Sequence, residues 1–222
     1  MQAAAIALIV ASYLVGSCPT AYLVARWRQG IDIRQYGTGN VGGTNVGVQI
    51  GMWATVLVGI ADIVKGALPV WVALAVGQGA GVAAMAGLAA VAGHDWSVFL
   101  GFKGGRGMAT TLGCLLVLAP WGTLVVLASL LIGRLIGLTA LVNGIGVAIL
   151  PFIALYRHQS MTIVLLCVAL VVLTLVKRLL ANGEPYPVGL SPSRVRLNRI
   201  LYDRDVGPSA QWGSRGERRP ER

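Results

Sequence analysis

The sequence predicts an all-α integral membrane protein with about seven transmembrane helices and glycine-rich loops on the cytoplasmic side. Hydrophobic residues make up 56% of the 222 residues, charged residues make up only 12%, and the mean hydropathy is +0.74. Soluble domains carry about a quarter charged residues, and a single core of this size could not bury so much apolar surface. Lipid is therefore the expected solvent for most of the chain.

Six apolar stretches have the composition of membrane-spanning helices. They lie at residues 3–25, 53–76, 80–93, 111–133, 135–156 and 160–176. The first is longer than the apolar segment of a signal peptide and has no basic segment before it, so we expect a span that is not cleaved. None shows the alternation typical of a transmembrane β-barrel.

Basic residues predict the orientation, because loops rich in Lys and Arg stay in the cytoplasm. Such residues follow the first, third and last stretches, namely Arg26, Arg28, Arg34, Lys103, Arg106, Lys177 and Arg178. Six simple spans would place the last group on the wrong side. A break of the 111–133 stretch at Pro120 gives seven spans, since neighbouring helices can cover the backbone that proline leaves unpaired. The N-terminus is then outside and the C-terminus is cytoplasmic.

The composition changes near residue 181. Residues 182–222 contain eight Arg and five acidic residues but one short apolar cluster. We therefore expect a multi-span membrane domain over residues 1–181 and a basic, largely disordered cytoplasmic tail over residues 182–222. The net charge of +10 then reflects topology and tail rather than nucleic acid binding. The cysteines lie far apart in apolar runs and predict neither a disulfide nor a metal site; they are Cys18, Cys114 and Cys167.

The loop between the first two stretches contains six glycines from Gly37 to Gly51. The polar residues interleaved with them are Thr38, Asn40, Thr44 and Asn45. Glycine lets the backbone approach a ligand, while hydroxyl and amide groups supply hydrogen bonds. This mixture favours a binding loop over the alternative, a flexible connector.

A second glycine-rich loop precedes the 111–133 stretch. It contains two cations and four glycines, which are Lys103, Arg106, Gly101, Gly104, Gly105 and Gly107. Glycines and cations at a helix start can bind a phosphate, although the spacing is not that of an ATPase P-loop. The alternative is an interfacial loop that follows the positive-inside rule, which explains the cations but not the glycines.

Ionisable residues occur inside or beside the spans. Asp62 and Lys65 can pair at i and i+3 on one helix face, either to support a site or as a structural pair. His94 beside Asp95 is a further but weaker candidate.

Five blocks of sequence resemble the acyl-phosphate-dependent glycerol-3-phosphate acyltransferases, the PlsY family. They are GSCPTAYLVAR from Gly16, YGTGNVGGTNV from Tyr36, DIVKG from Asp62, GHDWSVFLGFKGGRGMAT from Gly93 and KRLLANGE from Lys177. The resemblance implies a seven-helix enzyme of the bacterial inner membrane. It also implies acyl transfer from acyl phosphate to sn-glycerol 3-phosphate, giving lysophosphatidate and phosphate, with no metal or other cofactor.

The resemblance also implies roles for individual residues. The catalytic group would be Thr38, Asn40, Asn45 and His94, with Thr38 orienting the acceptor hydroxyl. The phosphate-binding loop would be Lys103, Gly104, Gly105, Arg106 and Gly107. The supporting residues would be Asp62, Lys65, Arg178 and Glu184. The expected partners are acyl phosphate, glycerol 3-phosphate and membrane lipids, and no nucleic acid.

Three apolar residues depart from the family pattern. Val48, Val172 and Leu175 stand where the family has Arg, His and Asn, and none of them can hydrogen-bond through its side chain or move a proton. Two other functions therefore stay open. One is a non-catalytic relative that binds phosphorylated lipid precursors or regulates an acyltransferase. The other is a transporter that uses the intramembrane pair of Asp62 and Lys65.

Overall fold

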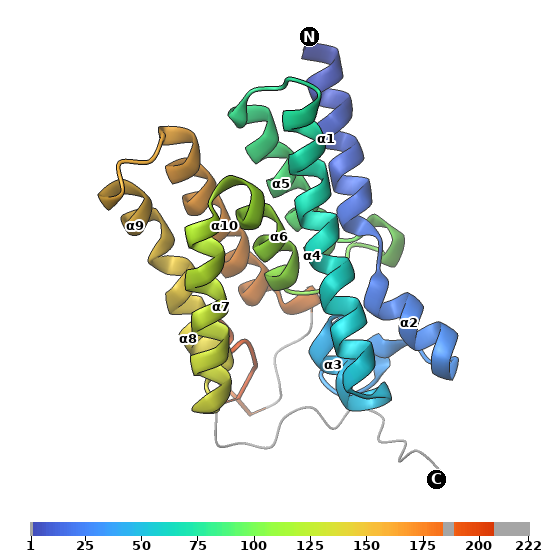
Figure 1. Cartoon of the computed structure of the whole chain (residues 1–222). Coiled ribbons are helices and arrows are strands. Elements are labelled where there is room, and N and C mark those ends of the chain that lie inside the picture. The colour runs from blue at the N-terminus through green and yellow to red at the C-terminus, as the bar shows by residue number, and fades with distance from the viewer. Residues whose placement is uncertain (1, 184–188, 207–222) are drawn as a thin grey trace.

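The structure, a computed structural model, describes residues 2–183 and 189–206, and its elements there are helices (Figure 1). The α-helices are α1 (Gln2–Ser17), α2 (Thr20–Gln29), α3 (Gly43–Ile50), α4 (Met52–Ala75), α5 (Ala80–Asp95), α6 (Met108–Leu118), α7 (Pro120–Leu135), α8 (Thr139–Ala148), α9 (Leu150–Tyr156), α10 (Met161–Leu180) and α11 (Pro192–Tyr202). The predicted all-α class is confirmed.

Five helical stretches are long and apolar enough to cross a bilayer. They are Gln2–Gln29, Met52–Ala75, Ala80–Leu100, Thr139–Tyr156 and Met161–Leu180. The shorter apolar helices α6 and α7 lie beside them. A total of seven spans requires each of these two to cross as well, and that count stays a prediction.

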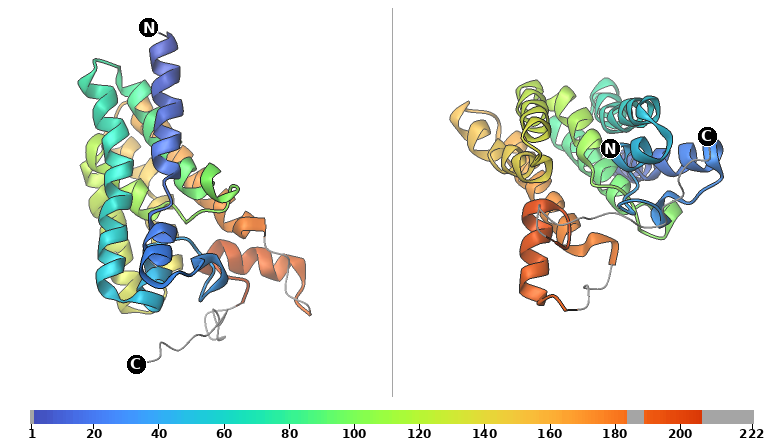
Figure 2. Two further views of the ribbon diagram at one scale, coloured as in Figure 1. Left: turned by 90° about the vertical axis from the view of Figure 1, so that its right-hand side faces the viewer. Right: turned by 90° about the horizontal axis from the view of Figure 1, so that it is seen from below.

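Prolines divide the apolar stretches where their missing N–H and their ring interrupt a helix. The expected break at Pro120 is present, and α6 and α7 meet there in a tight turn (Figure 1). Pro19 produces a break that the sequence reading missed, since residues 3–25 were expected to form one span. Here α1 ends at Ser17, and α2 continues at an angle to it (Figures 1 and 2).

Small residues let the helices approach closely, as is common in membrane proteins. Gly93 of α5 lies so near α1 that an added Cβ would overlap the carbonyl oxygen of Tyr13. In the same way, a Cβ at Gly113 of α6 would overlap the carbonyl oxygen of Ile63 in α4. The packed interior is therefore built largely on backbone contact between helices.

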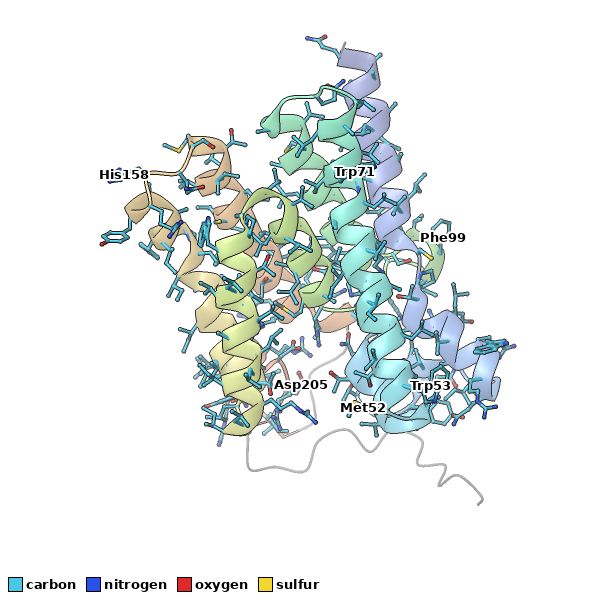
Figure 3. The ribbon with its side chains drawn as sticks, in the orientation of Figure 1. Met52, Trp53, Trp71, Phe99, His158 and Asp205 are labelled. Carbon is cyan, nitrogen blue, oxygen red and sulfur yellow. The ribbon has the colours of Figure 1, made fainter. Side chains whose placement is uncertain are left out.

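Large apolar side chains cover the outer helix faces, where lipid would surround them. Met52 and Trp53 are exposed at one end of α4, and Trp71 is exposed toward its other end (Figure 3). Tryptophan favours the two membrane interfaces, so the length of α4 matches a complete crossing.

The expectation of a largely disordered tail is wrong for residues 192–202, which form α11. Ser191 caps this helix by accepting a hydrogen bond from the Arg194 amide, and Val195 is fully buried against the bundle. One buried valine and several polar contacts hold α11, so hydrophobic composition alone does not reveal it. Residues 184–188 and 207–222 lie outside the described part of the chain.

We expect Gly93→Ala to lower the free energy of unfolding by about 1–3 kcal/mol, because the added methyl overpacks the contact between α1 and α5. The matched control is Gly81→Ala on the same helix, where an added Cβ meets nothing within 4 Å. Thermal unfolding in detergent measures both variants. Equal stability of the two would show that the backbone contact at Gly93 is not tight.

Candidate functional site

A cavity of about 480 Å³ opens between α4 and α6 on one side and α7, α8 and α10 on the other. This volume is typical of sites for small molecules. Its polar lining includes Thr38, Asn40, Asp62, His94, Arg106, Asn143, Thr174, Lys177, Arg178 and Asp203. Its apolar wall includes Met108, Leu112 and Leu130. The cavity therefore combines charged groups with a surface suited to a hydrocarbon chain.

The first glycine loop is organised by Asn45, which is buried in α3. Its Nδ2 donates to the carbonyl oxygens of Ile33, Tyr36 and Asn40 at 3.1, 3.0 and 3.0 Å. Its Oδ1 accepts from the Thr38 amide at 3.2 Å. Because these bonds use both ends of the amide, Asn45 positions the loop and does not face the cavity.

Thr38 and Asn40 reach the cavity from that loop. The Thr38 hydroxyl accepts a hydrogen bond from the Asn40 backbone amide at 3.3 Å. The buried Oδ1 of Asn40 has no hydrogen-bond partner among the described residues, so it is available to a ligand. Gly37 and Gly39 on either side of Thr38 have φ of +55° and +70°, values that glycine adopts most easily.

The second glycine loop is shaped by close contact with α5. The Gly105 amide donates to the His94 carbonyl at 3.0 Å, and a Cβ at Gly104 would overlap that same carbonyl oxygen. Of the predicted phosphate-binding residues, Arg106 and Gly107 line the cavity. Lys103 is exposed and does not line it, so the structure does not bring its side chain together with Arg106.

Asp62 is the centre of a buried network that joins three helices. Its Oδ1 accepts from the Thr20 hydroxyl at 2.5 Å and lies 2.9 Å from Lys65 Nζ and 3.8 Å from His94 Nδ1. Lys65 also donates to the Cys18 carbonyl at 2.9 Å, which lies at the break beside Pro19 and accepts from the Thr20 backbone amide as well. The predicted pairing of Asp62 with Lys65 is therefore formed, and Asp62 and His94 border the cavity.

Lys177 and Arg178 at the end of α10 point inward. Lys177 donates to the Asp95 carbonyl and to Asn182 Oδ1, the latter at 2.7 Å, and its Nζ lies 5.1 Å from the Trp96 ring centre. Arg178 donates to the carbonyl oxygens of Ala140 and Ile200, both at 2.7 Å. Partners on several elements thus fix both cations beside the cavity.

Arg106 connects this cluster to the C-terminal helix. Its Nε lies 3.0 Å from Asp203 Oδ1, and its Nη1 donates to the Lys177 carbonyl at 3.2 Å. Burial raises the pKa of the Asp203 carboxyl, while Arg106, Arg178 and Lys177 act in the opposite direction. An acidic side chain therefore lies among the three cations.

The sequence reading missed several residues of the cavity. Asn143 is a polar residue within an apolar stretch, and this could have indicated a functional role. Its buried Oδ1 lacks a hydrogen-bond partner among the described residues. In the sequence, Lys177 served only as a basic residue that predicts the cytoplasmic side. Asn182, which accepts a hydrogen bond from Lys177 beside the cavity, has φ of +59°, a conformation that Asn tolerates better than most residues. Asp203 lies in the expected tail and gave no local signal.

The three apolar departures lie outside the cavity. Val48, Val172 and Leu175 are 74%, 51% and 39% exposed, and none of them lines the cavity. On α10 the neighbouring Thr174 faces the cavity instead. Glu184 lies outside the described residues.

Comparison with known proteins identifies the family. The family model described as glycerol-3-phosphate acyltransferase matches residues 6–182. The chain belongs to this family. Its relatives include "Glycerol-3-phosphate acyltransferase 5" of Dehalococcoides mccartyi, 38% identical over 216 residues, with 95% of this chain and 93% of the relative covered. They also include "Glycerol-3-phosphate acyltransferase 2" of Moorella thermoacetica, 42% identical over 189 residues, with 81% and 95% covered.

Solved structures of PlsY (YgiH), an integral membrane glycerol 3-phosphate acyltransferase, share the fold. The glycerol 3-phosphate form is 30% identical with a TM-score of 0.72, and 82% of this chain and 94% of that chain are covered. The lysophosphatidic acid form is 27% identical with a TM-score of 0.69 and the same coverage. The chain is therefore a multi-pass membrane protein of a family that serves phospholipid biosynthesis.

The helix α11 lies beyond the part that the family model matches. The match to the Dehalococcoides mccartyi relative leaves out about 5% of the chain at most, so it includes α11.

We expect Lys65→Met to lower the free energy of unfolding by about 3–5 kcal/mol, because it leaves the Asp62 carboxylate buried without a cation. Thermal unfolding in detergent checks this. The double variant Lys65→Met with Asp62→Leu removes both charges and should recover part of the loss. If the double variant loses more stability than the losses of Lys65→Met and Asp62→Leu added together, the pairing is contradicted.

Proposed function

We propose that this chain transfers a fatty acyl group from acyl phosphate to the first hydroxyl of sn-glycerol 3-phosphate, giving lysophosphatidate and phosphate. It would act in a bacterial plasma membrane, with its N-terminus outside and its C-terminus and motif loops in the cytoplasm. One observation carries the proposal: a single cavity joins three cations and the Thr38 hydroxyl to an apolar wall. These are the groups that a phosphorylated acceptor and an acyl chain require.

The cations suit the phosphate groups. Arg106, Lys177 and Arg178 line one region of the cavity, and guanidinium groups bind phosphate oxygens through paired hydrogen bonds. Limited access of water strengthens such interactions. The titles of the PlsY structures name glycerol 3-phosphate and lysophosphatidic acid as bound species, which supports the same acceptor here.

Acyl transfer would depend on positioning. A bond forms between the acceptor oxygen and the acyl carbon, the bond from that carbon to the phosphate oxygen breaks, and the hydroxyl gives up its proton. The departing phosphate can accept that proton, so the reaction balances without a cofactor. Thr38 would orient the acceptor hydroxyl or donate to the oxyanion at the acyl carbon. Met108, Leu112 and Leu130 would contact the acyl chain.

A non-catalytic relative is the second candidate, and the apolar Val48, Val172 and Leu175 favour it. These three side chains are exposed and do not line the cavity, so the enzyme proposal relies on the polar groups that do line it. The transporter has less support. Its main argument was the intramembrane pair of Asp62 and Lys65, which is already satisfied by Thr20 and the Cys18 carbonyl.

We expect the purified protein to release phosphate and form lysophosphatidate from acyl phosphate and glycerol 3-phosphate. We expect Thr38→Val to lower kcat about 100-fold, because a hydroxyl that acts in the transition state is lost. Thr38→Ser, which keeps the hydroxyl, is the matched control and should stay active. Absence of turnover together with retained binding of glycerol 3-phosphate would support the non-catalytic relative.

We expect Arg106→Met to raise KM for glycerol 3-phosphate about 10- to 100-fold, because a charge-assisted contact to the phosphate is lost. The matched control is Lys103→Met, which removes an exposed cation from the same loop and should change KM about twofold at most. Initial rates at varied acceptor concentration measure both. A larger effect at Lys103 would place the phosphate on the exposed side of the loop and contradict its assignment to the cavity.

A further inference from the structure

Asp203 is an unusual neighbour for a phosphate site. It follows α11 and adopts φ of +55°, and its backbone amide donates to the Arg199 carbonyl at 3.1 Å. Its carboxylate lies 3.0 Å from Arg106 and lines the cavity together with Lys177 and Arg178. A carboxylate therefore holds a cation that the proposed function assigns to a substrate phosphate.

Charge repulsion prevents the Asp203 carboxylate and a phosphate from lying beside the same cations together. The acids that line the cavity among the described residues are Asp62 and Asp203, and Asp62 is held by Lys65 and Thr20. Asp203 is thus the anion among the three cations. A phosphate dianion in the same place would be repelled by a neighbouring carboxylate, as like charges at close range are.

We propose that the Asp203 carboxylate occupies the place of the acceptor phosphate, so that glycerol 3-phosphate binds by displacing Asp203 from Arg106. Asp203 is then a residue that determines affinity for the acceptor, contributed by a helix beyond the family match at residues 6–182. This inference rests on the proposed function for the identity of the displacing anion.

The way α11 docks permits such a displacement. The helix extends away from the bundle (Figure 2). It is held by the hydrogen bond from Arg178 to the Ile200 carbonyl and by one from Arg199 to the Leu179 carbonyl at 3.2 Å. Val195 is the fully buried apolar side chain of this contact. The docking of α11 therefore depends largely on polar contacts, whereas the bundle helices meet through close backbone contacts at Gly93 and Gly113.

Removing the competing anion should strengthen acceptor binding. If Asp203 occupies the site most of the time, the apparent affinity is reduced by the fraction of open sites. We expect Asp203→Asn to lower both KM and Kd for glycerol 3-phosphate about 5- to 10-fold, with kcat within about twofold of the original value. Initial rates measure KM, and calorimetry on the full chain in detergent measures Kd.

Two further variants make the test specific. Val195→Asp undocks α11 and should lower Kd in the same direction while leaving Asp203 in the sequence. Asp32→Asn neutralises an acid that does not line the cavity and whose Oδ2 lies 2.7 Å from Arg34 Nη2. This variant should therefore leave Kd unchanged. If Asp203→Asn does not fold, as judged by its thermal transition, Val195→Asp decides the question.

The outcomes separate this inference from the proposed function. Unchanged or weaker binding of glycerol 3-phosphate by Asp203→Asn overturns the inference. A lower kcat at unchanged KM also overturns it, since Asp203 would then act in the reaction. A chain that shows no turnover refutes the enzyme, but the calorimetric comparison still tests the displacement.

Discussion

Asp62 and Arg178 are charged side chains that this bundle removes from water, and each needs partners because an isolated buried charge costs several kcal/mol, a large fraction of a typical fold's stability. Asp62 meets this requirement with Lys65 and Thr20, and Arg178 meets it with backbone carbonyls of α8 and α11. Asp62 and Lys65 lie within α4, but their further partners come from the break between α1 and α2, where Thr20 and the Cys18 carbonyl lie.

Helix ends supply the acceptors for the cations. The Cys18 carbonyl at the break beside Pro19 accepts from Lys65, and the end of α5 presents the Asp95 carbonyl to Lys177. These carbonyls carry the partial negative charge of helix C-termini, which favours cations. The glycine loops allow the termini to approach one another closely enough for this arrangement. A substrate phosphate would meet cations whose positions are already fixed, and the binding site is thereby preorganised.

The sequence predicted those features that depend on local or periodic signals. Hydropathy predicted the helical class. Pro120, together with the need to place the basic loops on one side of the membrane, predicted the break at that proline. The i,i+3 spacing predicted the pair of Asp62 and Lys65. Three features depend on contacts between distant segments and could not be predicted. Lys103 and Arg106 are three residues apart, yet only Arg106 faces the cavity. Val172 and Leu175 occupy motif positions but point outward. The docking of α11 relies on polar contacts that leave no pattern in composition.

The short helix α6 has a consequence for where a product would emerge. Its 11 residues cover about 16 Å, roughly half of the hydrocarbon layer of a bilayer. The cavity is lined by Met108 and Leu112 of α6 and by Thr38 of the first glycine loop, so it extends from the polar loops to the apolar part of the bundle. Under the proposed function, a lipid formed there would have its tail beside these apolar side chains rather than in water. Sideways diffusion between helices would then suffice for release, without lifting the chain through water.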